Sequence, residues 1–163
     1  MSNVVYMSLG SNVGDRGEQL RRAISRIAEH GHVRSVSSFY ETEPVEVSDQ
    51  PWFLNCAVAL ETSEPPERLM AALLEIEREM GRKRIRKKGP RNVDIDILLY
   101  ADLVVNTPEL TVPHPAMASR RFVLEPLAEI AAEVRHPVVG KTVRDLLEEL
   151  PAGQRVRRIK TRE

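Results

Sequence analysis

The sequence predicts an α+β fold of the ferredoxin-like type, in which an antiparallel sheet packs helices on one face and carries substrate loops on the other, plus C-terminal additions. Two observations lead to this prediction. Hydrophobic periodicity over the first hundred residues follows the order strand, helix, strand, strand, helix, strand. No internal repeat or linker interrupts the 163 residues, so residues 1–163 are expected to form one domain. The tail after about residue 150 is a candidate flexible segment.

The first strand and the first helix have clear local signals. Val4–Leu9 has the pattern of a strand that ends at Gly10. Asp15 is a favourable N-cap, and Glu18, three residues later, occupies the capping-box position. Apolar side chains then recur at helical spacing until Gly31, which is suited to a C-cap.

The next elements repeat this order. Strands are expected over Val33–Tyr40 and Phe53–Leu60, separated by a loop over Glu41–Pro51 that is rich in proline and aspartate. A second helix starts near Pro65, and its apolar stripe ends at Gly81.

The segment after the second helix combines a basic run with a strand. After the basic residues 82–91, the alternation in "VDIDILLY" predicts a strand with Asp94 and Asp96 on one face and branched aliphatic residues on the other. Beyond Asp102 the pattern is weaker. It indicates a short strand near Val104, a turn at "VPHP", and helical stretches after Ala118 and Thr142.

Composition narrows the class of protein. The 24 basic and 24 acidic residues balance, so the overall charge favours neither a nucleic-acid partner nor an anionic membrane. Cys56 is the only cysteine, which excludes an internal disulfide and suits a reducing compartment. The N-terminus does not have the pattern of a signal peptide, and no apolar run reaches the roughly 20 residues of a membrane span. A cytoplasmic location is expected.

The paired aspartates Asp94 and Asp96 are a candidate metal site. Two carboxylates two residues apart on a strand repel each other, and Mg²⁺ is a hard cation that prefers such oxygen ligands. A solvated strand face would explain the same pattern. The preceding run "RKRIRKKGPR", Arg82–Arg91, adds seven cations beside the two acids, which together could hold a polyphosphate and its metals. The ordinary alternative is a solvated basic loop.

Two further polar residues lie in informative surroundings. His114 is held between prolines in "VPHPAM" and precedes Arg120 and Arg121, so it could meet a phosphate. Asn55 shares a strand face with Phe53, and its amide suits the polar edge of a heterocycle on which an aromatic ring stacks. Core packing or an ordinary turn would also account for these residues.

The segment "SLGSNVGD", Ser8–Asp15, is only superficially like a phosphate-binding loop. It lacks the G-K-[ST] ending of a Walker motif and the third glycine of a dinucleotide fingerprint. Gly10 and Gly14 are therefore interpreted as glycines of a tight strand-to-helix turn.

Taken together, five segments resemble the 6-hydroxymethyl-7,8-dihydropterin pyrophosphokinase family of folate biosynthesis. They are "SLGSNVGD", "SSFYETEP", "QPWFLNCAVALET", "KKGPRNVDIDIL" and "LTVPHPAMASRRFVLEPL". They occur in the family's order and extend to about Leu150, leaving the basic tail uncovered. Lys88 occupies a place where many family members carry tryptophan.

The resemblance implies transfer of a diphosphate from ATP to the pterin's hydroxymethyl oxygen, with release of AMP, by one catalytic domain. It implies two Mg²⁺ ions at Asp94 and Asp96. Because a metal bound to the hydroxyl lowers its pKa, no strong protein base is needed, and Asp96 is a candidate proton acceptor. Phosphate contacts would come from Arg82, Arg84, Arg91, His114 and Arg120, of which Arg82 and Arg91 would be catalytic. Pterin contacts would come from Thr42, Val45, Phe53, Asn55 and Phe122. The expected partners are ATP and the pterin, with no nucleic acid, no membrane and no obligate protein partner.

Two other functions fit parts of the pattern. An RNA-recognition module would use a similar sheet, but it stacks bases on exposed aromatic residues, and only 4% of this chain is aromatic. A two-metal nuclease or phosphatase could use the same paired aspartates. Pterin-dependent formation of AMP from ATP would separate these functions.

Overall fold

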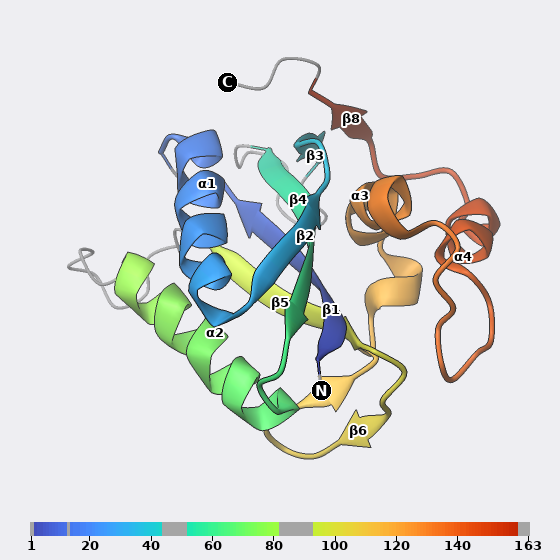
Figure 1. Cartoon of the computed structure of the whole chain (residues 1–163). Coiled ribbons are helices and arrows are strands. Elements are labelled where there is room, and N and C mark those ends of the chain that lie inside the picture. The colour runs from blue at the N-terminus through green and yellow to red at the C-terminus, as the bar shows by residue number, and fades with distance from the viewer. Residues whose placement is uncertain (1, 13, 44–51, 82–92, 160–163) are drawn as a thin grey trace.

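The computed structural model describes residues 2–12, 14–43, 52–81 and 93–159. The strands of this part are β1 (Asn3–Ser11), β2 (His32–Val36), β3 (Tyr40–Thr42), β4 (Phe53–Thr62), β5 (Asp94–Tyr100), β6 (Val105–Asn106), β7 (Thr111–Val112) and β8 (Val156–Arg158). Antiparallel pairing joins them in the order β5-β1-β4-β3-β8, with β2 also on β4, while β6 and β7 pair separately (Figure 1). The predicted antiparallel α+β architecture is confirmed.

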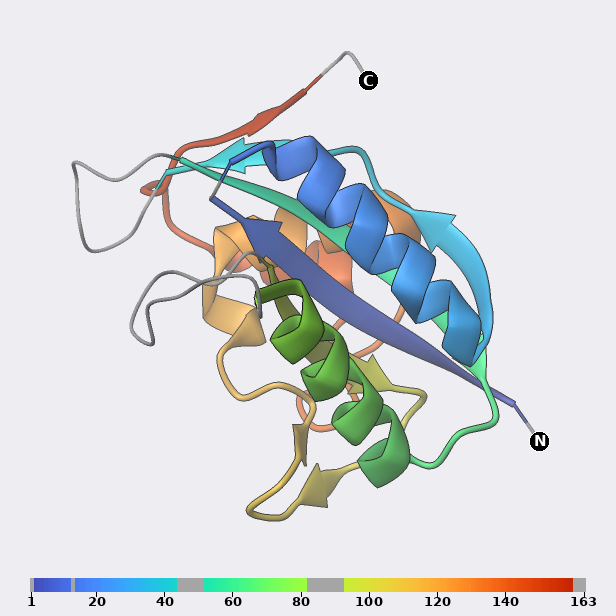
Figure 2. The same cartoon turned by 90° about the vertical axis from the view of Figure 1, so that its left-hand side faces the viewer.

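Helices cover both faces of the sheet. They are α1 (Arg16–Ile27), α2 (Pro66–Gly81), α3 (Arg121–Ala131) and α4 (Val143–Glu149), with the 3-10 turns η1 (Ala28–His30) and η2 (Met117–Ser119). α1 and α2 lie across one face, as Figure 2 shows from that side, while α3 lies against the other face and α4 packs on α3. The expectation that helices occupy only one face is therefore wrong, because the C-terminal additions bring α3 onto the second face.

Strand alternation divides the core into two layers. On β1, Val5, Met7 and Leu9 are buried against α1 and α2. On the opposite face Ala57 of β4 and Leu99 of β5 are buried with α3 and α4. On this second face a pocket opens at the end that carries Ser8 and Gly10.

Helix boundaries follow their capping residues. The Asp15 carboxylate accepts a hydrogen bond from the Glu18 N–H at 3.1 Å, which confirms the predicted N-cap. The helix ends earlier than expected, because η1 replaces its last turn and Gly31 follows η1 rather than α1. At α4, Thr142 and Asp145 form a reciprocal capping box.

The strand expected over Val33–Tyr40 is divided into β2 and β3. The interruption has a long-range cause: the N–H of Ser38 donates to the Glu129 carboxylate of α3, at 3.0 and 3.1 Å, and not to β4. The chain resumes pairing at Tyr40, so Glu41 and Thr42, expected in a loop, belong to β3.

The described part of the tail after residue 150 contains a strand of the sheet, β8. β8 pairs with β3, and the N–H of Ile159 donates to the Phe39 carbonyl at 2.8 Å. The flexibility of the tail stays a prediction. No helix within the described residues is long and apolar enough to span a membrane.

Candidate functional site

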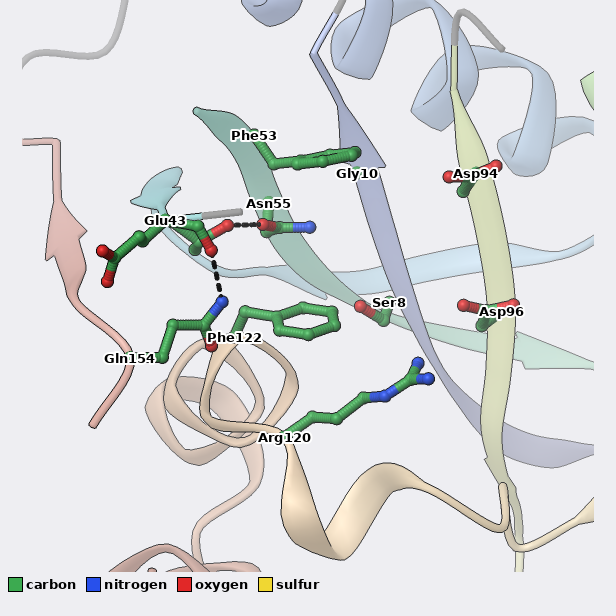
Figure 3. Close-up of a pocket in the computed structure, with 11 residues that line it drawn as sticks. Ser8, Gly10, Glu43, Phe53, Asn55, Asp94, Asp96, Arg120, Phe122 and Gln154 are labelled. Carbon is green, nitrogen blue, oxygen red and sulfur yellow. Dashed lines mark hydrogen bonds between the residues drawn. The ribbon is translucent and has the colours of Figure 1, made fainter. Parts of the chain in front are cut away.

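A pocket opens on the α3 side of the sheet, where β1 ends and β4 and β5 begin, beside the start of α3 (Figure 3). Seven of the residues predicted from the sequence line it, on four separate segments of the chain. They are Thr42, Phe53, Asn55, Asp94, Asp96, Arg120 and Phe122. Residues up to 80 positions apart are therefore brought to one concave surface.

The sheet register explains how these side chains meet. Asp94 of β5 lies opposite Gly10 of β1, and Gly10 lies opposite Asn55 of β4. One step along the same face, Asp96 lies opposite Ser8. Directly opposed residues of antiparallel strands project to the same side, so the register places the carboxylates and the amide on one face.

Gly10 leaves the space that Asn55 occupies. A Cβ atom at position 10 would lie 2.4 Å from Asn55 Nδ2 and 3.8 Å from a ring carbon of Phe53. Gly10 belongs to β1, so the interpretation of this glycine as part of a tight turn is wrong. Gly14, with a φ of 60°, does have the backbone conformation that favours glycine in a turn.

Asn55 is a buried amide held in one orientation. Its Oδ1 accepts a hydrogen bond from Thr42 Oγ1 at 2.5 Å, and its Nδ2 donates to the Leu9 carbonyl at 3.3 Å. Asn55 is 4% exposed and Thr42 is 2% exposed. An amide has two N–H donors and two acceptor lone pairs, so a fixed Asn55 keeps hydrogen-bonding capacity for a ligand.

Two aromatic rings flank this amide. Phe53 comes from the start of β4 and Phe122 from the first turn of α3, and in Figure 3 they lie on opposite sides of Asn55. The Arg120 guanidinium carbon lies 5.5 Å from the centre of the Phe122 ring, a cation–π contact. This end of the pocket suits a flat polar heterocycle between two rings.

The two carboxylates form the other end of the pocket. Ile95 and Ile97 are buried in the core, so Asp94 and Asp96 project from the opposite face of β5, with Asp94 exposed and Asp96 half-buried. The N–H of Ile95, between them, donates to the Glu77 carboxylate of α2 at 2.6 Å, which fixes this edge strand.

The carboxylates of Asp94 and Asp96 fit a hard divalent cation that would also be bound by the substrate. Among the described residues no group of three or more acidic, histidine or cysteine side chains could enclose a metal by itself. Two carboxylates side by side would therefore bind Mg²⁺ together with phosphate oxygens and water, which is the usual composition of a magnesium site.

His114 is not among the residues that line the pocket, but its backbone N–H donates to the Leu98 carbonyl of β5 at 2.9 Å, two residues after Asp96. Burial lowers its pKa and the positive charge of Arg120 acts in the same direction, while the carboxylate of Asp96 opposes them. His114 Nδ1 accepts a hydrogen bond from the Ala116 N–H at 3.1 Å. The neutral ring therefore carries its proton on Nε2, a donor suited to a phosphate oxygen.

Other predicted residues lie outside the described residues. They are Val45, Arg82, Arg84 and Arg91, together with Lys88 and the rest of the basic segment. Their roles in phosphate or pterin binding stay predictions.

The pocket also contains residues that sequence reasoning missed: Ser8, Gly10, Glu43 and Gln154. Strand alternation could have placed Ser8 and Gly10 on the face of the paired aspartates. Glu43 directly follows Thr42. Gln154 has no sequence signal, since it enters the pocket only because β8 pairs with β3.

The chain is similar to proteins of one known family. The profile of the family described as 7,8-dihydro-6-hydroxymethylpterin-pyrophosphokinase (HPPK) matches residues 6–132. The 2-amino-4-hydroxy-6-hydroxymethyldihydropteridine pyrophosphokinase of Bacillus subtilis is 48% identical over 136 residues, 82% of this chain and 81% of its own length. The enzyme of the same name from Methylorubrum extorquens is 43% identical over 151 residues, covering 91% of this chain and 94% of the relative.

Longer proteins contain a similar region. The folic acid synthesis protein fol1 of Schizosaccharomyces pombe is 40% identical over 153 residues, which cover 93% of this chain but 21% of fol1. The crystal structure of wild-type Plasmodium falciparum HPPK-DHPS with pteroate matches with a TM-score of 0.72 and 15% identity, over 91% of this chain and 44% of the other. This structural match supports the fold alone. The family profile matches most of the chain, and the Bacillus subtilis and Methylorubrum extorquens relatives match over most of their own length. The chain therefore belongs to the 7,8-dihydro-6-hydroxymethylpterin-pyrophosphokinase family.

Proposed function

We propose that this chain transfers the terminal diphosphate of ATP to the hydroxymethyl oxygen of 6-hydroxymethyl-7,8-dihydropterin, giving AMP and the pterin diphosphate. One observation carries the proposal: a single pocket joins an amide between two aromatic rings to a pair of carboxylates. The first end suits a pterin and the second suits a metal-bound polyphosphate. Membership in a pyrophosphokinase family gives the reaction class.

At the pterin end, Asn55 reads the polar edge of the heterocycle. Thr42 and the Leu9 carbonyl fix the amide before the ligand arrives, so little side-chain entropy is lost on binding. Phe53 and Phe122 stack on the two faces of the ring, and they exclude water around the reacting oxygen.

At the phosphate end, Asp94 and Asp96 would hold Mg²⁺, for which we propose two ions. Bound there, the metal would neutralise phosphate charge and lower the pKa of the attacking hydroxyl. Arg120 adds a positive charge at the start of α3, and the Nε2–H of His114 donates to a phosphate oxygen. Arg82, Arg84 and Arg91 complete this set as predictions from the sequence.

The transfer forms a bond between the hydroxymethyl oxygen and the β-phosphorus, and it breaks the bond from that phosphorus to the oxygen of AMP. The proton of the hydroxyl group needs an acceptor, and we assign Asp96 to this role. Preorganised charges around the transferring group account for most of the rate in reactions of this class.

The other functions considered fit the pocket less well. An RNA-recognition module would place stacking aromatic residues along its central strands, whereas here Asp94 and Asp96 line the open face and repel phosphates. A nuclease or phosphatase would share the paired acids but would have no use for an amide between two phenyl rings.

The test is a turnover assay with ATP, Mg²⁺ and the hydroxymethyl pterin, in which AMP is measured. We expect AMP formation that requires all three. Formation of ADP, or AMP formation that is independent of the pterin, would contradict the proposal.

Two further assignments complete the proposal. We class the fold as ferredoxin-like, supported by the order β5-β1-β4 followed by β2 and β3, with neighbouring strands antiparallel. We also assign the chain to the cytoplasm. Its one cysteine, Cys56, is buried and cannot form an internal disulfide, which suits a reducing compartment. No obligate protein partner is proposed.

A further inference from the structure

The C-terminal tail contributes to the pocket although it lies outside the family match. The match ends at residue 132, whereas Gln154 lines the pocket beside Thr42 and Asn55. In Figure 3 the Gln154 side chain reaches Glu43 at the amide end of the pocket, away from Asp94 and Asp96. The tail thus lies at the end that we assign to the pterin.

The contact between the tail and Glu43 is extensive. Gln154 Nε2 donates to the Glu43 carbonyl at 2.5 Å. The backbone N–H of Glu43 donates to the Arg155 carbonyl at 3.0 Å, and the N–H of Arg155 donates to the Glu43 carboxylate at 3.0 Å. Two of these hydrogen bonds fix the backbone of Glu43, which directly follows Thr42, and the third fixes its side chain.

β8 also makes β3 an internal strand. β3 has only three residues, and without β8 it would be an edge strand paired to β4 alone. Val156 lies opposite Thr42, the residue that donates to Asn55 Oδ1. Anything that holds β3 in place therefore also holds the orientation of the Asn55 amide.

Side chains of the tail reinforce this attachment. Arg157 pairs with Glu41, which also pairs with Arg16 at 2.8 Å. The guanidinium carbons of Arg155 and Arg157 lie 5.3 and 5.7 Å from the centre of the Trp52 ring. Trp52 is the only tryptophan of the chain, so its fluorescence reports whether the tail is docked.

We propose that Gln154 is a positioning residue of the pterin site, which acts through the Glu43 carbonyl and β3 on Thr42 and Asn55. This inference rests on the proposed function. It assigns to the tail a role in recognition of the pterin and none in binding of ATP, since Gln154 lies at the amide end of the pocket.

The test compares full-length Gln154→Ala and Gln154→Glu with the wild type by calorimetry. Glutamate keeps the size of the side chain but cannot donate to the Glu43 carbonyl. We expect the Kd for the hydroxymethyl pterin to rise about fivefold to tenfold in Gln154→Ala, the loss expected for one hydrogen bond, and at least as much in Gln154→Glu. The Kd for a non-hydrolysable ATP analogue with Mg²⁺ should stay unchanged.

The matched control is Arg158→Ala. Arg158 belongs to the same strand, but its side chain contacts Ser38 and Glu129 and lies away from the pocket. We expect this variant to bind the pterin as the wild type does. Trp52 emission of the ligand-free protein should be the same in the wild type, Gln154→Ala and Gln154→Glu, because the rest of the tail remains attached.

Two results would overturn the inference. The first is an unchanged Kd for the pterin in both Gln154 variants. The second is a shift in Trp52 emission with equal losses of pterin and ATP affinity, which would make Gln154 a general anchor of the tail. A wild-type chain that binds ATP but no pterin would contradict the proposed function as well, and this outcome is distinct because it appears before any substitution.

Discussion

Alanine at Gly10 would test how the pocket is built. The added Cβ atom would lie 2.4 Å from Asn55 Nδ2, closer than the 3.0 Å below which real Cβ contacts are essentially never found. Gly10 lies inside β1, between β4 and β5, so its backbone cannot easily retreat. The amide of Asn55 has to move instead.

The cost of this movement follows from the two hydrogen bonds that hold Asn55. Rotation of the amide would weaken its bonds to Thr42 Oγ1 and to the Leu9 carbonyl. Each is worth about 1 kcal/mol, and leaving a buried polar group unpaired costs about 1–3 kcal/mol. We therefore expect Gly10→Ala to lower the free energy of unfolding by about 1–3 kcal/mol and to weaken pterin binding at least about tenfold.

Two other glycines provide matched controls. At Gly17 of α1 a Cβ atom would meet only the flexible end of Arg21, at 3.3 Å, so Gly17→Ala should be neutral or stabilising by up to about 1 kcal/mol. At Gly31 a Cβ atom would lie 2.3 Å from the backbone carbonyl oxygen of Glu61. Gly31→Ala should therefore destabilise the protein without a specific loss of pterin affinity, because Gly31 lies beside Glu61, at the opposite end of β4 from Phe53 and Asn55.

The assay combines urea unfolding of each variant with calorimetry of pterin and of an ATP analogue at a temperature where all variants are folded. Gly10→Ala alone should lose affinity for the pterin while it retains affinity for the nucleotide. If Gly10→Ala binds the pterin as tightly as Gly17→Ala does, then the orientation of Asn55 does not control the site and the reasoning is refuted.

Three further predictions concern the pocket and the histidines. Asp94→Asn and Asp96→Asn should each reduce AMP release by orders of magnitude, because a metal ligand is lost. The melting temperature without Mg²⁺ should stay equal or rise, because one of two like charges is removed. Near wild-type AMP release by both variants would contradict the metal assignment. Asn55→Ala should weaken pterin binding by about 1–3 kcal/mol for each polar group of the pterin that loses its hydrogen bond, and it should leave ATP binding nearly intact. A fall in ATP affinity, measured by calorimetry, would instead indicate that Asn55 is a structural residue. Burial lowers the pKa of both His114 and His136 in the folded protein below the ordinary value of 6.5. As the pH falls, these histidines therefore take up protons at a higher pH in the unfolded chain than in the folded protein. The free energy of unfolding should consequently decrease as the pH drops below about 6.5. His136→Asn keeps a side-chain acceptor and should make this dependence shallower in melting curves from pH 7 to 5; an unchanged slope would exclude His136 as a contributor.

Local sequence patterns predicted most of the elements. The alternation in "VDIDILLY" gave β5 and the side on which Asp94 and Asp96 project, and the apolar stripe after Pro66 gave α2 up to Gly81. Capping by Asp15 depends on residues three positions apart. Such features are decided by near neighbours, and for that reason they can be predicted without the fold.

The interruption between β2 and β3 could not be predicted in the same way. Val33–Tyr40 has the composition of a continuous strand, but Glu129, 91 residues after Ser38, takes the Ser38 N–H away from the sheet. The position of α3 on the second face is likewise a matter of packing between distant segments. Local periodicity contains no information on either point.

By itself, the sequence determined the α+β class, the strand that carries the paired aspartates, and the residue types of the site, because these depend on periodicity and on short motifs. Only the tertiary structure decided that Gly10 makes room for Asn55 and that Gln154 from the tail enters the same pocket. Both depend on which strands become neighbours and in what register. That choice is made by long-range pairing of β1 with β4 and of β3 with β8, and no stretch of sequence specifies it alone.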